Sequence, residues 1–143
     1  MKPAVQYASV IAVILTAGLL RLAAAADATG TVHLRGSNYD GVDTGTALAL
    51  PWPAGGPPVL WKRALGQGFS GFIVVDDKVY TQTQKRSGQY VVCLDLRSGR
   101  TIRQTRYDWP WQYNGDWPGP YGTPTYANGR VYFCGAQGLV GCV

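Results

Sequence analysis

Two stretches of this chain repeat one pattern at an offset of 52 residues. Residues 69–82 read FSGFIVVDDKVYTQ, and residues 121–134 read YGTPTYANGRVYFC. Each has an aromatic residue, a small residue, an extended apolar segment, a two-residue turn, a basic residue and then Val-Tyr. The second turn is Asn128-Gly129, the strongest short hairpin signal, because a type I′ turn needs positive φ at both positions. Each copy is therefore predicted to form a β-hairpin.

A strand–turn–strand pattern follows the first hairpin. Residues 89–107 read QYVVCLDLRSGRTIRQTRY, in which 90–94 and 101–107 are predicted strands because they are rich in β-branched and aromatic residues. Between them, Asp95 can accept hydrogen bonds from the backbone just ahead, and Gly99 can adopt a left-handed conformation without steric cost. The segment therefore predicts two strands joined by a tight turn.

The second hairpin is followed by the beginning of the same pattern. GLVGCV, at 138–143, matches QYVVCL, with Cys142 in the place of Cys93 and three residues fewer in the connecting loop. A unit of about fifty residues with four strands is typical of a β-propeller, which closes with four to eight blades. We expect an all-β fold: an irregular segment over 27–58, then about the first two four-stranded blades of a truncated propeller over 59–143, with further blades to follow.

The first 26 residues have the layout of a signal peptide, which is expected to be helical. Lys2 precedes the apolar run ASVIAVILTAGLL, and small residues follow it up to Ala26. The run of 13 is short for a membrane-spanning helix, which needs about 20 apolar residues. We expect an exported protein, periplasmic or secreted, with an uncleaved leader as the only membrane attachment.

The basic residues do not predict a nucleic-acid site. The formal net charge is +5, and the one loose cluster is Arg97, Arg100, Arg103 and Arg106. In a strand, a spacing of three splits these side chains across both faces. The cluster is interpreted as a solvated strand and turn.

The three cysteines allow two interpretations. Export permits disulfides, and Cys134 and Cys142 could bridge facing strands of one hairpin if their register allowed it. Alternatively Cys93, Cys134 and Cys142 are small buried apolar residues, which is the interpretation we favour.

No catalytic group is predicted. GQGFSG, at 66–71, has dinucleotide-motif spacing but precedes a predicted strand, whereas that motif requires a helix. The single histidine, His33, is interpreted as a packing or surface residue. Asp40 and Asp43 are expected in an exposed loop, and the oxygens of residues 38–43 offer at most a weak Ca²⁺ contact.

The aromatic residues of the connection between the two units are the predicted partner-binding or ligand-binding loop. Interspersed prolines prevent a regular strand there. Exposed Trp and Tyr side chains are good anchors for protein partners and for the flat apolar faces of sugars. The alternative is that the loop folds back and caps its own blade. The candidates are Trp109, Trp111, Tyr113, Trp117 and Tyr121.

Three motifs together resemble exported bacterial PQQ-like repeat proteins, which have a quinoprotein-like β-propeller. HLRGSNYDGV (33–42) resembles the opening segment of that family. PWPAGGPPVLWKRALGQGFSG (51–71) resembles its entry into the first blade, with Trp61-Lys62 closing a strand. CLDLRSGR (93–100) resembles its blade turn.

The resemblance implies two functions, and the tryptophan-rich connection alone suggests a third. The first is a non-catalytic scaffold or binding module with an envelope protein as partner. The second is a PQQ-dependent quinoprotein dehydrogenase, in which PQQ and calcium would lie on the propeller axis, mostly in the missing C-terminal part; no residue here matches those ligands. The third is a carbohydrate-binding propeller. We favour the first, because residues 1–143 show no cluster of catalytic groups and a shared fold does not fix the function.

Overall fold

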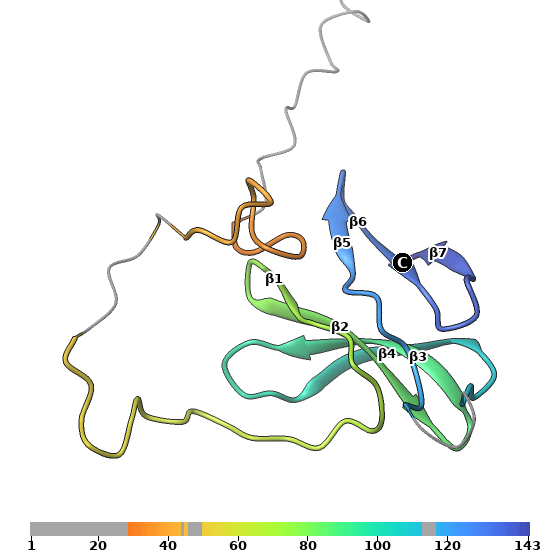
Figure 1. The fold of residues 1–143 in the computed structure, drawn as a ribbon, viewed down its shortest axis with the longest axis horizontal. Helices are drawn as coiled ribbons and strands as arrows, with labels where there is room; N and C mark the ends of the chain where they lie inside the picture. Colours follow the sequence, from red (N-terminus) through yellow and green to blue (C-terminus); the bar gives the residue numbers. More distant parts are fainter. Residues whose placement is uncertain (1–28, 44, 46–49, 113–116) are drawn as a thin grey trace, which may run out of the picture.

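The structure is a computed structural model that describes residues 29–43, 45, 50–112 and 117–143. The predicted signal peptide lies outside these residues. The described part of the chain forms two antiparallel β-sheets and no helix, so the expected all-β class is confirmed (Figure 1). None of the described segments forms a helix that could reach across a bilayer.

The first sheet is a four-stranded meander. Its strands are β1 (Ile73–Val75), β2 (Lys78–Lys85), β3 (Gly88–Asp95) and β4 (Thr101–Asp108), and they are hydrogen-bonded in that order. The two strands predicted after the first hairpin are thus confirmed as β3 and β4.

The turn between β3 and β4 has the predicted chemistry. The Asp95 carboxylate accepts hydrogen bonds from the Ser98 amide at 2.7 Å and from the Ser98 hydroxyl. These hydrogen bonds hold the pKa of Asp95 below its usual value. Gly99 has φ +67°, a left-handed conformation that glycine adopts without strain.

The second sheet has three strands, β5 (Thr125–Ala127), β6 (Arg130–Cys134) and β7 (Val140–Cys142), again in sequence order. The turn from β5 to β6 is the predicted one, since Asn128 and Gly129 have φ values of 51° and 77°. Both predicted hairpins are confirmed.

The strand register repeats from one sheet to the other. Tyr80 lies opposite Cys93 in the first sheet, and Tyr132 lies opposite Cys142 in the second. The same correspondence relates Val74–Val79 to Tyr126–Val131. Positions related in this way are called sister positions below. The offset is 52 residues in the hairpins and 49 in the third strands, as the shorter loop predicts.

Each sheet has two faces, because successive side chains of a strand point to opposite sides. In the first sheet we call the side of Val79, Val92 and Leu94 the front face, and the side of Ile73, Val75, Tyr80, Gln82, Gln84, Gln89, Val91 and Cys93 the back face. By sister positions, the front face of the second sheet carries Val131, Phe133 and Val143, and its back face carries Tyr132 and Cys142.

The front face of the first sheet is covered by an extended segment of the chain. Trp61 and Leu65 pack against Val79, Val92 and Leu94. The Trp61 indole donates a hydrogen bond of 2.9 Å to the Leu96 carbonyl. The strand expected to close at Trp61-Lys62 is not formed: Trp61 and Leu65 attach through side-chain packing and the indole, and the segment pairs with the sheet through its main chain only at Gln67, opposite Gln84.

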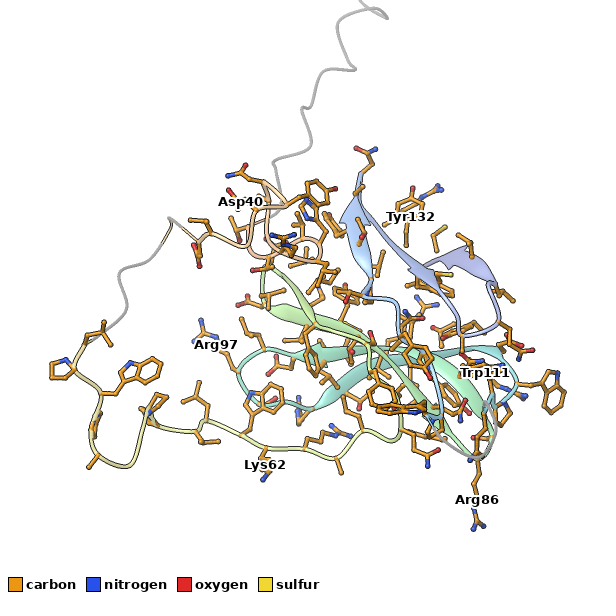
Figure 2. The ribbon with its side chains drawn as sticks, viewed as in Figure 1. Asp40, Lys62, Arg86, Arg97, Trp111 and Tyr132 are labelled. Carbon is orange, nitrogen blue, oxygen red and sulfur yellow. The ribbon has the colours of Figure 1, made fainter. Side chains whose placement is uncertain are left out.

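The two sheets stack with their front faces pointing in the same direction. Ile73 and Val75 on the back face of the first sheet form a buried cluster with Val131 on the front face of the second. The ring of Tyr107, from β4, lies 4.6 Å from that of Phe133. Figure 2 accordingly shows Tyr132, a back-face residue, on the side of the second sheet remote from the first. The front of one sheet therefore packs on the back of its sister.

The N-terminal described segment runs along the first strands of both sheets (Figure 1, orange). The amides of Val74 and Tyr126, which are sister positions, donate to the carbonyls of Thr31 and Val32 at 3.0 and 2.7 Å. The Asp76 amide donates to the Thr29 carbonyl at 2.8 Å. These hydrogen bonds occupy main-chain groups that an exposed strand edge would otherwise leave unpaired.

Candidate functional site

The connection between the sheets is bound to the end of the first sheet through a glutamine side chain. The Gln84 amide donates to the Trp111 carbonyl at 2.9 Å and accepts from the Trp111 amide at 2.6 Å. Gln89 similarly donates to the Trp109 carbonyl at 2.9 Å. The connection thus folds back over its own sheet, as the alternative interpretation proposed (Figure 2).

A buried polar network joins the two sheets beneath this connection. Gln82 donates to the Gly122 carbonyl at 2.6 Å and accepts from the Tyr107 hydroxyl at 2.8 Å. Gln89 accepts from the Ala136 amide at 3.0 Å. Gln82, Gln84 and Gln89 are all buried, so their polar groups need these partners. Burial, and secondarily the charge of Asp108, raises the pKa of Tyr107 well above its usual value, so the hydroxyl remains a donor.

Three exposed aromatic side chains gather on the outside of the connection. Phe69 stacks on Tyr121 with ring centroids 5.4 Å apart and planes 9° from parallel, and Trp117 lies 5.3 Å from Phe69 at 48°. Phe69, Trp117 and Tyr121 remain 49%, 61% and 42% exposed. We call these three residues the aromatic surface. The rings of Trp111 and Tyr121 form a T-shaped pair with centroids 6.0 Å apart.

Backbone contacts hold the aromatic surface in place. The Phe69 amide donates to the Pro120 carbonyl at 2.9 Å, and the Tyr121 hydroxyl donates to the Trp117 carbonyl. Because these bonds and the ring contacts already hold Phe69, Trp117 and Tyr121 beside one another, part of the side-chain entropy is lost before a ligand binds.

The structure brings together only some of the predicted aromatic candidates. Trp111, Trp117 and Tyr121 meet at the aromatic surface, whereas Trp109 is 71% exposed and lies apart, with the Arg106 guanidinium 4.4 Å from its ring. Tyr113 lies outside the described residues. Phe69 was missed because it was considered only as part of the repeat and of the glycine-rich entry to the first sheet, and not as a binding residue. The sequence signal that could have identified Phe69 is its sister position, Tyr121, which is itself a predicted candidate.

The other singled-out polar residues form no shared site, and the Nδ1 atom of His33 is buried without a hydrogen-bond partner. His33 is buried and stacks on Tyr39 at 3.6 Å. The carboxylates of Asp40 and Asp43 accept from the amides of Val42 and Gly45. Among the described residues, no group of three or more His, Cys, Asp or Glu side chains could hold a metal ion.

The three cysteines are free thiols in the structure. Cys93 is buried beside Tyr80, and burial raises the pKa of both groups, that of Tyr80 to about 12. Cys134 and Cys142 are exposed, so the expectation that all three are buried is wrong for these two. They belong to the back face of the second sheet, which no other described element covers. Cys93, the sister of Cys142, is buried because the second sheet covers the back face of the first.

Comparisons of the chain with models of known families, with curated proteins and with solved structures found no match.

Proposed function

We propose that the two sheets are consecutive blades of a quinoprotein-like β-propeller in an exported repeat protein. The observation that carries this proposal is the same-sense stacking of sister sheets. A packing of front on back repeats through a rotation and can close into a ring, whereas a two-fold sandwich would pack like faces together. The N-terminal segment that bonds both β1 and β5 is consistent with these strands being innermost.

The described residues near these inner strands do not fit a quinone cofactor with calcium. The Val74, Asp76 and Tyr126 amides are already bonded to residues 29–32, and the described part of the chain offers no cluster of metal ligands. We therefore assign no catalytic step to these residues. Alcohol or sugar oxidation that depends on added PQQ and Ca²⁺ would contradict a non-catalytic function.

We propose that the chain acts as a binding module through the aromatic surface. Three fixed, exposed rings offer large apolar contact area, the property that makes Trp and Tyr frequent energetic anchors. Two ligand classes suit them: carbohydrate, whose sugar rings have flat apolar faces, and a segment of an envelope protein.

The test compares two exposed tryptophans. Trp117→Ala removes a ring of the aromatic surface, and Trp109→Ala removes a ring that is at least as exposed and lies apart. We expect Trp117→Ala to weaken retention by about tenfold or more, in polysaccharide-containing gels or in pull-downs from envelope extract, and Trp109→Ala to leave it unchanged. Equal effects of the two substitutions, or no retention by either probe, would refute the assignment.

A further inference from the structure

A row of three side chains crosses the back face of the first sheet. Tyr80 of β2 lies opposite Cys93 of β3, and Cys93 in turn lies opposite Arg103 of β4. Cys93 is only 7% exposed, whereas Arg103 is exposed at the margin of the sheet. Lys78 belongs to the same face, because it precedes Tyr80 by two positions in β2. One face of the sheet therefore presents a hydroxyl, a thiol and two cations.

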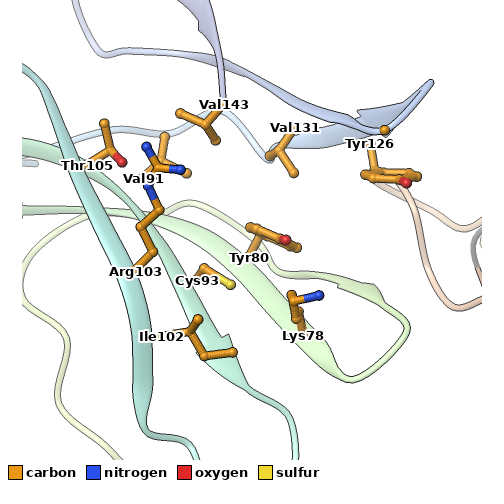
Figure 3. Close-up of a pocket in the computed structure, with 11 residues that line it drawn as sticks. Lys78, Tyr80, Val91, Cys93, Ile102, Arg103, Thr105, Tyr126, Val131 and Val143 are labelled. Atoms are coloured by element: carbon orange, nitrogen blue, oxygen red, sulfur yellow. The ribbon is translucent and has the colours of Figure 1, made fainter.

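These four side chains line a cavity between the two sheets, which has a volume of about 250 Å³. Figure 3 shows Tyr80 and Cys93 between Lys78 and Arg103, with Val131 of the second sheet across the space from them. Apolar side chains make up much of the remaining wall, among them Val91, Ile102 and Val131. The cavity thus combines an apolar wall with two cationic groups.

The positive charge of this cavity is not balanced by its own wall. None of the described residues that line it is acidic. Burial raises the pKa of the Cys93 thiol and raises that of Tyr80 to about 12, so both groups are neutral near pH 7. Asp95 lies opposite Lys78, but its carboxylate accepts hydrogen bonds from the amide and the hydroxyl of Ser98.

We infer that this cavity binds a small organic anion, a monocarboxylate carried on an apolar ring. The carboxylate is bound by Arg103, whose guanidinium can donate two parallel hydrogen bonds, and the charge of Lys78 adds to the attraction. The ring lies against Val91, Ile102 and Val131. An apolar cavity of about 150 Å³ is large enough for benzene, so this cavity of about 250 Å³ has room for a ring with its carboxylate.

This site goes beyond the binding function proposed above, because it shares no residue with the aromatic surface. Loss of retention in Trp117→Ala would concern the aromatic surface alone. Failure to bind a small carboxylate would concern the cavity alone.

The first test titrates the full chain with benzoate and, as the control, with benzamide, which has nearly the same shape and no charge. For so small a ligand we expect a benzoate dissociation constant of about 1 mM. The largest amide shifts in nuclear magnetic resonance spectra should fall at Cys93, Arg103 and Val131. Benzamide should bind about fivefold more weakly or worse. Equal affinities, or shifts confined to other parts of the chain, would overturn the inference.

Two arginines allow a matched comparison of variants. Arg103→Gln and Arg97→Gln remove the same charge from exposed positions, but Arg97 belongs to the β3–β4 turn and does not line the cavity. We expect Arg103→Gln to weaken benzoate binding by about fivefold or more while leaving benzamide binding unchanged. Arg97→Gln should retain the native affinity for benzoate. The same loss in both variants would show that the guanidinium in the cavity has no special role.

The thiols of the native chain give a readout that needs no substitution. Cys93 lines the cavity, whereas Cys134 and Cys142 are exposed elsewhere and serve as internal references. We expect saturating benzoate to slow the alkylation of Cys93 by iodoacetamide by about fivefold or more, measured by mass spectrometry, because the ligand covers the thiol. The rates at Cys134 and Cys142 should not change. An unchanged rate at Cys93 under saturating benzoate would refute the site.

Discussion

At the scale of single residues, a buried glutamine of the first sheet, Gln82, contributes to the contact with the chain that leads into the second sheet. Gln82→Met keeps the shape of the side chain but leaves the Gly122 carbonyl without its donor and the Tyr107 hydroxyl with only its longer 3.3 Å hydrogen bond to Gln89. We expect a loss of about 1–3 kcal/mol in the free energy of unfolding, measured by urea denaturation, because buried groups lose their hydrogen bonds.

Tyr107→Phe is the matched control for Gln82→Met. It removes the hydroxyl while keeping the ring that packs on Phe133, and it should cost about 1 kcal/mol. Because both substitutions break the same hydrogen bond, the double variant should lose less stability than the two single losses added together. Strict additivity would show that the network does not act as a unit.

Turn residues were predictable from the sequence, and buried glutamines were not. Asn128-Gly129 and Gly99 have backbone requirements that few other residues meet, so their positions alone indicate the turns. Gln82 and Gln84 are polar residues in a strand, which suggests solvent. Their side chains bond to the Gly122 and Trp111 carbonyls of the connection, and that contact has no local sequence signal.

At the scale of the elements, the β3–β4 turn and the extended segment before the first sheet stabilise one another. A Cβ added to Gly99 would lie 2.6 Å from the Trp61 ring, whereas one added to Gly129 would meet nothing within 4 Å. Both glycines have positive φ, so alanine strains each by about 1–2 kcal/mol. We expect Gly99→Ala to lower the free energy of unfolding by clearly more than Gly129→Ala does, in parallel denaturant titrations.

Equal losses for Gly99→Ala and Gly129→Ala would mean that Trp61 is not fixed on the turn. The sequence predicted the turn correctly but placed Trp61 in a strand by resemblance. An extended segment can attach to a sheet through an indole and apolar side chains without pairing as a strand. A paired strand uses the same residue types, so the sequence does not distinguish the two arrangements.

At the scale of the whole molecule, the internal repeat predicted two sister sheets with matching register, and it did not predict which faces meet. The strand pattern describes each unit by itself, whereas the choice of faces that meet depends on contacts between the two units. The aromatic surface illustrates the same limit: Phe69 and Tyr121 are sister positions 52 residues apart, and only the stacking of the sheets brings their rings together.

The proposed propeller depends above all on the front face of the second sheet packing on the back face of the first. Nuclear Overhauser effects in the full chain test this most directly. We predict contacts from the Phe133 ring to Tyr107 and from the Val131 methyls to Ile73 and Val75, with none from Tyr132 to the first sheet. Contacts from Tyr132 and Cys142 to the first sheet, in place of those from Val131 and Phe133, would contradict the account.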